Sequence, residues 1–270
     1  MYTRVELEAL VGTVPWWWHS IDLGQGVVTP GHKGPLGVMQ DELATLQLPD
    51  LTHKTVLDIG TMDGFYAFEA ERRGARRVVA VDYYSWSLDL ANHATYMADC
   101  QRRGVRPAPD ETSPHWHPDT LPGKRGYDTA HQALGSRVET VVADYLTLDP
   151  EKFGTFDVTL FLGVLYHLED PLRGLRQVAA LTRGVAVIET AAMLLTDRDE
   201  ALVAFYEANE LDNDMSNWWV PTMPALLGLC RAAGFRDVKI VQGPPVVKDP
   251  WWRRRAPPVR YYRAMVQAFK

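Results

Sequence analysis

The chain has 270 residues, of which 46% are hydrophobic and 23% are charged, enough to bury the core of one large domain. Its net charge of -6 and its pI near 5.8 argue against a broad phosphate-binding surface. No apolar run is long enough to cross a bilayer, and the N-terminal sequence MYTRVELEALVG lacks the apolar region of a signal peptide. We therefore expect a cytoplasmic protein with no membrane partner.

Residues 1–50 are expected to form a cap of helices and loops before a core domain that spans residues 51–270. The core begins with the apolar run Val56-Leu57, which leads into a glycine-containing turn. A helix pattern starts at Phe65 and ends near Gly74. The run 78–81 is then suited to a parallel strand buried on both faces.

Two insertions interrupt the core, at about residues 104–126 and 190–221. Before the first, a helix is expected from Ser85, as its N-cap, to Arg103; the insertion itself holds five prolines and should be irregular. In the second, a helix is expected over Asp197–Glu210. The other expected helices are Tyr127–Leu134, one beginning at Asp170-Pro171, and Met223–Ala233.

Five further strands follow the first two. They are expected at Val138–Ala143, Phe156–Leu162, Arg183–Glu189, Val238–Val241 and Tyr261–Ala268. The alternation of strands and helices predicts an α/β protein with a Rossmann-like, seven-stranded, mostly parallel sheet and helices on both faces, with insertions after strands 2 and 5. Ligands of such sheets bind beyond the carboxyl ends of the strands.

The turn after the first strand is the strongest functional signal. Gly60 and Gly64 allow a tight turn and a close backbone approach, and Asp82 follows at the spacing of an acid that binds a ribose. Met62 stands where a dinucleotide site usually has glycine, and Asp63 would repel a pyrophosphate. The turn therefore favours a nucleoside cofactor without phosphates. A structural turn without a ligand is the alternative.

This pattern resembles motif I of the class I S-adenosylmethionine-dependent methyltransferases. Further strings resemble the family related to the tRNA wobble-uridine carboxymethyltransferases: WWWHSIDLGQGVVTPG (16–31), VLDIGTMDGFYAFEAERRGA (56–75), AHQALGSRVE (130–139) and FDVTLFLGVLYHLEDPL (156–172). The likeness runs from about Trp16 to Val241. It departs from those enzymes at Thr61-Met62-Asp63 and in the N-terminal WHSIDL string.

The resemblance implies a site for S-adenosylmethionine. The methionine part would lie on Asp58, Gly60 and the backbone of Thr61, Met62, Asp63 and Gly64. Asp82 would bind the ribose hydroxyls and Tyr83 would lie beside the adenine. Asp144 and Tyr145 would contact the adenine, and Leu162-Gly163 would pass beneath the sulfonium. Capping of a turn is the alternative role for Asp144, and capping of the following helix for Asp63.

His167 lies just past the fourth strand, where a methyl acceptor would approach. We predict that it is the catalytic base or orients the acceptor; holding its own loop or the cofactor is the alternative. Tyr166 is a candidate for orienting the acceptor. Trp18 and His19 of the N-terminal WWWHS string, and Trp218 of the second insertion, can contact an aromatic or cationic acceptor or simply pack.

No metal site is expected. His115 and His117 have no carboxylate or cysteine cluster near them, and the run Asp212-Asn213-Asp214 lacks the glycine and terminal glutamate of a calcium loop. Cys100 and Cys230 are expected to pack within helices.

The predicted function is transfer of a methyl group to an oxygen or nitrogen of a small molecule, in natural-product biosynthesis for example. The first alternative is a tRNA wobble-uridine enzyme, which the mixed arginine and aromatic segment Lys248–Arg263 favours. That family uses a carboxylated donor, and no set of cationic side chains for its carboxylate can be placed here. The second alternative is a cofactor-binding module without catalysis. The sequence leaves the oligomeric state open.

Overall fold

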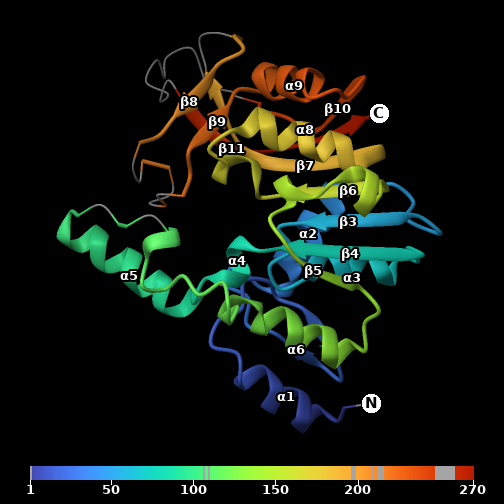
Figure 1. Cartoon of the computed structure of the whole chain (residues 1–270), viewed down its shortest axis with the longest axis vertical. Helices are drawn as coiled ribbons and strands as arrows, with labels where there is room; N and C mark the ends of the chain where they lie inside the picture. The colour runs from blue at the N-terminus through green and yellow to red at the C-terminus, as the bar shows by residue number, and fades with distance from the viewer. Residues whose placement is uncertain are drawn as a thin grey trace. The chain divides into compact units, whose positions relative to one another are not determined.

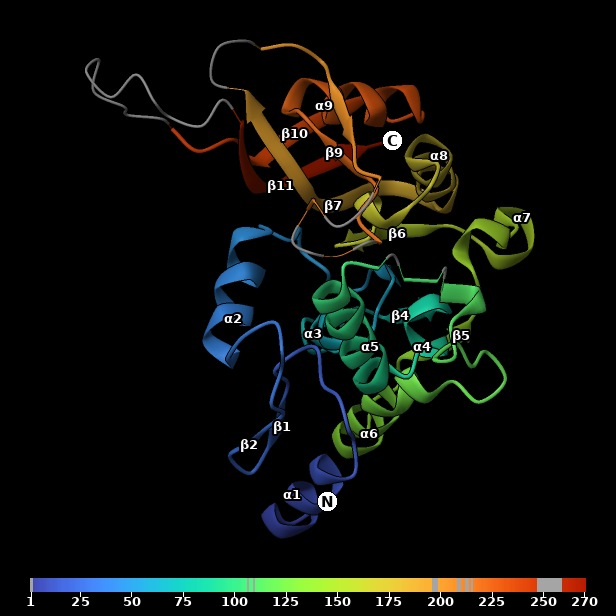
Figure 2. The same cartoon turned by 90° about the vertical axis from the view of Figure 1, so that its left-hand side faces the viewer.

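The computed structural model describes residues 2–105, 107–108, 110–195, 199–207, 210–211, 214, 216–246 and 259–270. The chain forms two compact units, Met1–Asp149 and Pro150–Lys270. Figures 1 and 2 show the helices and strands of each unit from two directions.

The first unit combines an N-terminal part with three parallel strands and their helices. Its helices are α1 (Arg4–Gly12), α2 (Leu36–Thr45), α3 (Phe65–Arg72), α4 (Tyr84–Ser87), α5 (Leu90–Arg103) and α6 (Arg125–Leu134), with 3-10 turns η1 (Asp110–Thr112), η2 (Pro122–Lys124) and η3 (Tyr145–Thr147). A short hairpin joins β1 (Asp22–Gly24) to β2 (Val27–Val28), and the sheet strands are β3 (Thr55–Ile59), β4 (Arg77–Asp82) and β5 (Glu139–Val142).

The sheet of the first unit has the order β3, β4, β5, and its neighbouring strands are parallel. Every residue of β3 is buried, as expected for a strand covered on both faces. Removing a side chain such as that of Leu57 from water contributes about 1.5–3 kcal/mol. Helix α3 packs against β3 and β4 (Figure 1). The expected strands and the helix that begins at Phe65 are thus confirmed.

The second unit holds the remaining sheet strands. Its strands are β6 (Phe156–Leu162), β7 (Thr182–Leu195), β8 (Val203–Phe205), β9 (Trp219–Pro221), β10 (Asp237–Gln242) and β11 (Val259–Phe269). Its helices are α7 (Pro150–Phe153), α8 (Pro171–Leu181) and α9 (Met223–Ala232), with a 3-10 turn η4 (Leu165–His167). Asp170 caps α8 through its side chain, as its position before Pro171 predicts.

The sheet of the second unit has the order β10, β11, β7, β6. Strand β7 is parallel to β6, and β11 is antiparallel to both β7 and β10. Strand β7 is longer than the expected Arg183–Glu189, because its pairing with β11 continues as far as Leu195 and Val259. Helix α9 lies beside β10 in both views (Figures 1 and 2).

The expected helix Ser85–Arg103 is wrong in one respect, since it is broken into α4 and α5. Leu88 is extended and forms an isolated bridge with Trp116 of the proline-rich insertion, and Asp89 N donates to the carbonyl of His115. Asp89, not Ser85, caps the long helix. The insertion therefore imposes the break from a distance that local sequence patterns do not show.

The expected helix Asp197–Glu210 is also wrong. Val203–Phe205 form strand β8, which pairs antiparallel with β9 through Val203 and Pro221, and through Phe205 and Trp219. Pairing with a segment some 15 residues later overrides a local helix pattern. Residues 197–198 and 208–209 of the expected helix lie outside the described residues.

Candidate cofactor and acceptor sites

The turn between β3 and α3 adopts a conformation that only some residues tolerate. Gly60, Met62 and Gly64 all have positive φ, of 74°, 49° and 87°. Gly60 N donates to the carbonyl of Val81 at 2.9 Å, which fastens the turn to β4. Two hydrogen bonds hold Met62 in its strained conformation: its N donates to Asp82, and its carbonyl accepts from the indole of Trp86.

Asp58 points into the protein beneath this turn. Its side chain is buried and accepts a hydrogen bond of 2.6 Å from the hydroxyl of Thr61 and another from the backbone of Ala67. Burial, together with the nearby carboxylate of Asp82, raises the pKa of Asp58 to about 7. Asp58 thus joins the end of β3, the turn and the first turn of α3.

Asp82, at the end of β4, supports the turn from the other side. Its carboxylate accepts from Met62 N at 3.0 Å, from Ser85 N at 3.0 Å and from the Ser85 hydroxyl at 2.6 Å. Burial raises the pKa of Asp82 despite these donors. The backbone of Tyr83 is a fourth donor to Asp82, so the acceptor positions of the carboxylate, about four, are occupied.

The side chains expected at the adenine end lie in different environments. Tyr83 is half-buried and packs edge to face on Trp116, with ring centroids 5.8 Å apart. Asp144 is exposed and caps η3, because its side chain accepts from Leu146 N at 2.9 Å. Tyr145 is buried. The capping role that the sequence left open for Asp144 is therefore present.

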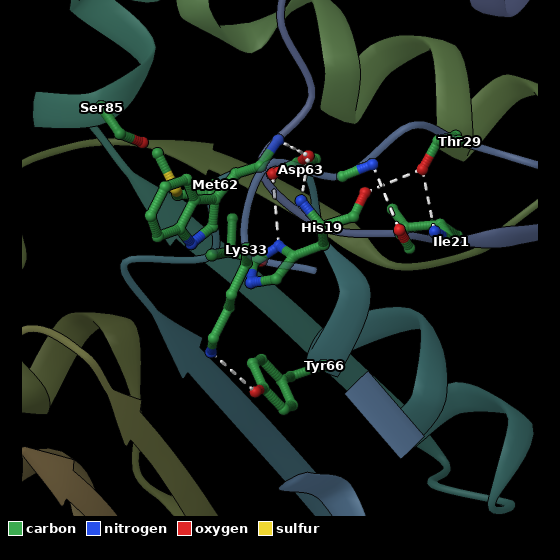
Figure 3. A network of polar contacts seen from close by, with 12 residues as sticks. His19, Ile21, Thr29, Lys33, Met62, Asp63, Tyr66 and Ser85 are labelled. Carbon is green, nitrogen blue, oxygen red and sulfur yellow. Dashed lines mark hydrogen bonds and ion pairs between the residues drawn. The ribbon is translucent and has the colours of Figure 1, made fainter. Parts of the chain in front are cut away.

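Asp63 contacts the N-terminal segment, a partnership that sequence reasoning missed. Oδ2 of Asp63 accepts from Trp18 N at 2.7 Å and from His19 N at 2.9 Å, and Oδ1 lies 3.2 Å from His19 Nδ1 (Figure 3). Helix α3 begins at Phe65 with Gly64 as its N-cap and no side-chain capping hydrogen bond, so Asp63 does not cap it. This acid of the Gly60–Gly64 turn thus anchors residues 18–19 of the N-terminal segment.

The N-terminal segment is itself well fastened. The Thr29 hydroxyl donates to the carbonyl of His19 and accepts from Ile21 N, both at 2.8 Å (Figure 3). His19 is buried, with its ring 5.7 Å from that of Phe65, whereas Trp18 is half-buried. Lys33 pairs with Glu42 at 2.7 Å.

In the second unit, Gly163 opens a polar cluster after β6. It has a φ of 74°, and its N donates to the carbonyl of Glu189 at 3.0 Å. A Cβ placed on Gly163 would lie 3.5 Å from the Tyr166 hydroxyl and 3.8 Å from both the Arg263 guanidinium and the Glu189 carboxylate. Leu162 and Gly163 are half-buried. The glycine therefore leaves room directly over three polar side chains.

Those side chains form a charge-balanced group. Arg263 holds buried Glu189 through two hydrogen bonds, one from Nε and one from NH2 at 2.6 Å. The guanidinium also stacks on the ring of Tyr166, 4.7 Å from its centroid, and lies 3.3 Å from its hydroxyl. Sequence reasoning placed Glu189 at a strand end and Arg263 in a basic and aromatic segment. It did not pair the two residues, because they lie 74 residues apart.

His167, the predicted base, lies half-buried in η4. Its Nδ1 is 2.9 Å from the Ser216 hydroxyl and 3.1 Å from the Ser216 carbonyl. Burial lowers the pKa of His167 below its usual range, although Asp214 opposes the shift. The imidazole is therefore neutral at pH 7, the form that accepts a proton. Ser216 carried no signal in the sequence.

Trp218 follows the same segment and lies beside η4. Its N donates to the carbonyl of Tyr166 at 2.8 Å, and its ring stacks near Phe205 with centroids 6.2 Å apart. The structure thus brings together Tyr166, His167 and Trp218 in the second unit. It brings together Asp58, Asp63, Asp82, Trp18 and His19 in the first.

Among the described residues, no three or more His, Cys, Asp or Glu side chains gather where a metal ion could bind. No described helix has both the length and the apolar character needed to cross a membrane. Cys100 and Cys230 are buried and unpaired with each other.

The chain matches the family model of the methyltransferase domain over residues 32–240. It is 28% identical to the tRNA U34 carboxymethyltransferase of Ectopseudomonas mendocina (strain ymp), over 71% of this chain and 48% of that protein. Identity to the enzyme of the same name from Pseudomonas putida (strain GB-1) is 26%, over 88% of this chain and 62% of that protein. The chain thus spans about half to three fifths of the length of these curated relatives.

A solved structure of similar fold is the N-terminal domain of EvdMO1 in the presence of SAH and D-fucose. Its TM-score is 0.60 at 17% identity, with 100% of this chain and 97% of that chain covered. The likeness confirms the predicted α/β fold class. The family match covers most of the chain, so S-adenosylmethionine is its cofactor, as predicted. The chain belongs to the methyltransferase domain family.

Proposed function

We propose that this chain transfers the methyl group of S-adenosylmethionine to an oxygen or nitrogen of a small molecule, with His167 as general base. The observation that carries the proposal is the setting of His167: a half-buried imidazole whose Nδ1 is occupied by Ser216, with burial lowering its pKa and so favouring the neutral form. Such a ring can take the proton that a hydroxyl or a protonated nitrogen must lose when it is methylated.

For the donor, we propose that the turn Gly60–Gly64 holds the methionine part and that Asp82 and Tyr83 hold the ribose and adenine. The positive φ values of the turn support this, as does the position of Asp82 beside it, where its carboxylate accepts from Met62 N. Asp58 and Asp63 then act by shaping the turn. Asp144 and Tyr145, and Leu162-Gly163 of the second unit, keep their proposed places at the adenine and the sulfonium.

We also propose that residues 1–50 act as a cap on the core. The hydrogen bonds from Trp18 N and His19 N to Asp63 support the proposal, since they connect the cap to the cofactor turn itself. Trp18 and His19, with Tyr166 and Trp218 of the second unit, remain our candidates for contact with the acceptor.

Methyl transfer needs little covalent machinery. Aligning nucleophile, methyl carbon and sulfur in one bound geometry can supply about 7–11 kcal/mol of the barrier. When bound, S-adenosylmethionine supplies the electrophilic methyl group. The residues of this chain bind and orient the two reactants, exclude water and accept the proton.

Charge supports a small acceptor. The whole chain carries a net charge of -6, and Arg263, which stacks on Tyr166 beside His167, is already paired with Glu189. A cation compensated in this way contributes little to the phosphate contacts that dominate binding of nucleic acids. Natural-product biosynthesis is the setting that we propose for such an acceptor.

The test is incubation with methyl-labelled S-adenosylmethionine, a small-molecule extract and tRNA, followed by separation of the two fractions. We expect label in the small molecules. His167→Ala should reduce its incorporation by about 10²–10⁴-fold, the usual effect of a general base, while donor affinity stays unchanged. His117→Ala, at an exposed histidine, is the control. Full turnover in the His167 variant would refute the base.

Transfer to tRNA is the second candidate, because the curated relatives carry that name at 26–28% identity. The basic and aromatic segment that favours it, Lys248–Arg263, lies outside the described residues up to residue 258. Label in the tRNA fraction would establish this function. Comparing S-adenosylmethionine with its carboxylated form as donor in the same assay would identify the group transferred.

A further inference from the structure

We propose that Asp214 and Ser216 are positioning residues that fix the proton of His167 on Nδ1 and leave the lone pair on Nε2. The inference rests on the proposed function, in which His167 is the base. It deepens that function by assigning the atom that accepts the proton and the residues that select it.

The geometry is a chain of three side chains within the second unit. The Ser216 hydroxyl donates to Asp214 Oδ1 at 2.7 Å, and Ser216 N donates to the same oxygen at 2.9 Å. The hydroxyl oxygen then lies 2.9 Å from His167 Nδ1, and the Ser216 carbonyl lies 3.1 Å from it. Two oxygens of one residue therefore face one ring nitrogen.

The directions of these hydrogen bonds decide the tautomer. A carboxylate only accepts, so the single proton of the Ser216 hydroxyl is committed to Asp214. The hydroxyl then presents only lone pairs to His167, and the carbonyl oxygen likewise only accepts. Both groups that face Nδ1 are acceptors, so Nδ1 carries the hydrogen. In a neutral imidazole this leaves Nε2 as the basic nitrogen.

The segment that carries the relay is fastened to its surroundings. Trp218 N donates to the carbonyl of Tyr166, and the buried Asn217 side chain donates to the carbonyl of Leu211 at 3.0 Å. The first bond holds the segment beside η4, which carries His167, and the second fixes the conformation of the segment itself.

Opposing charges surround the ring. Asp214 favours the protonated imidazole, whereas Arg263 of β11 disfavours it, and Arg263 is itself neutralised by Glu189 of β7. The ring of Tyr166 lies 4.2 Å away. Through Ser216, Asp214 also stabilises the imidazolium that forms when Nε2 takes up a proton, as an acidic partner of a catalytic histidine does.

The direct test is nitrogen NMR of the full chain without acceptor, with the His167 signals assigned from His167→Gln. We expect a protonated Nδ1 and an unprotonated Nε2 in the native protein. Ser216→Ala and Asp214→Asn should each lower the pKa of His167, on the order of one pH unit. Ser216→Ala leaves only the backbone carbonyl as an acceptor for Nδ1, so the fraction of the Nε2-protonated tautomer should rise. Ser216→Thr, which restores the hydroxyl, should return both values.

Two controls are built into the chain. Ser136→Ala removes a serine hydroxyl that donates to a carboxylate, that of Glu71 at 2.7 Å, in the first unit. It should leave His167 unchanged. The signals of His131, whose Nε2 lies 2.9 Å from the carbonyl of Val138, should stay constant in every variant.

Activity supplies a second readout. In the rate profile against pH, Ser216→Ala and Asp214→Asn should move the acidic limb to lower pH and reduce the plateau about tenfold. An Nε2-protonated His167 in the native protein, or an unchanged tautomer and pKa in both variants, would overturn the inference. Full turnover in His167→Ala, with the NMR results intact, would instead refute the proposed function alone.

Discussion

Replacing Asp63 with alanine is expected to release the N-terminal segment from the cofactor turn. The carboxylate accepts from two backbone donors, Trp18 N at 2.7 Å and His19 N at 2.9 Å (Figure 3). A hydrogen bond to a charged group contributes about 1.5–3 kcal/mol. Allowing for non-additivity between neighbours, we expect a loss of about 3 kcal/mol.

The loss of these hydrogen bonds should first ease the local opening of the N-terminal segment, not the unfolding of the whole unit. Residues 18–19 open without unfolding the strands, so their amides should exchange with solvent about 100-fold faster in Asp63→Ala than in the native protein. Hydrogen exchange read by mass spectrometry or NMR measures this. Asp22→Ala, which removes a single exposed bond to Gly24 N, is the matched control.

Unchanged exchange at Trp18 and His19 in Asp63→Ala would refute the anchoring role of this acid. Loss of protection from exchange throughout β3 and β4 would show that opening is not confined to residues 18–19, because Asp63 would then contribute to the stability of the whole unit. Donor affinity, measured by calorimetry on the same variant, then reports whether the anchored cap contributes to cofactor binding.

Three further substitutions test the turn. Gly64→Ala should lower the free energy of unfolding, measured by urea titration, by about 3 kcal/mol, because φ is 87° and the new Cβ would lie 2.6 Å from a ring carbon of Phe68. Gly104→Ala is the control: its φ is 61° and its Cβ would meet open space, so it measures the cost of the backbone conformation alone. The native protein should lose up to about 4 kcal/mol of stability as pH rises from 3.8 to about 7, since the fold raises the pKa of Asp58 and favours its protonated form. Asp58→Asn should flatten this dependence of stability on pH. The same pH dependence in the native protein and the variant would contradict the raised pKa of Asp58. Asp82→Ala should weaken donor binding by about 1.5–3 kcal/mol in calorimetry, and equal affinities would remove its role at the ribose.

Local patterns were sufficient for the strands of the sheet. Strand Phe156–Leu162 was predicted to the residue, because apolar residues at 156, 158 and 160–162, flanked by turn residues, fit a strand. Helix α5 and strand β8 were not predicted correctly. Both depend on pairing with a distant segment, Trp116 in one case and Trp219 in the other, and no local periodicity encodes such a partner.

The candidate site divides in the same way. Asp58 and Asp82 stood out because spacing along the chain places them at neighbouring strand ends, where the structure has them. The partners that set their chemistry did not stand out. Ser216 lies 49 residues from His167 and Arg263 lies 74 residues from Glu189, so only the folded chain reveals which side chain each one meets.

The charged groups of the first unit suit the proposed methyl donor, and those of the second unit suit the proposed proton acceptor. In the first unit, burial raises the pKa values of Asp58 and Asp82, so each acid gains from a cation that binds nearby. S-adenosylmethionine carries such a charge on sulfur and loses it on methyl transfer. We therefore expect the turn to favour donor over product, which aids product release. In the second unit, His167 as the proposed base would gain a positive charge as the sulfonium loses one, and Asp214 lies two hydrogen bonds away to stabilise it.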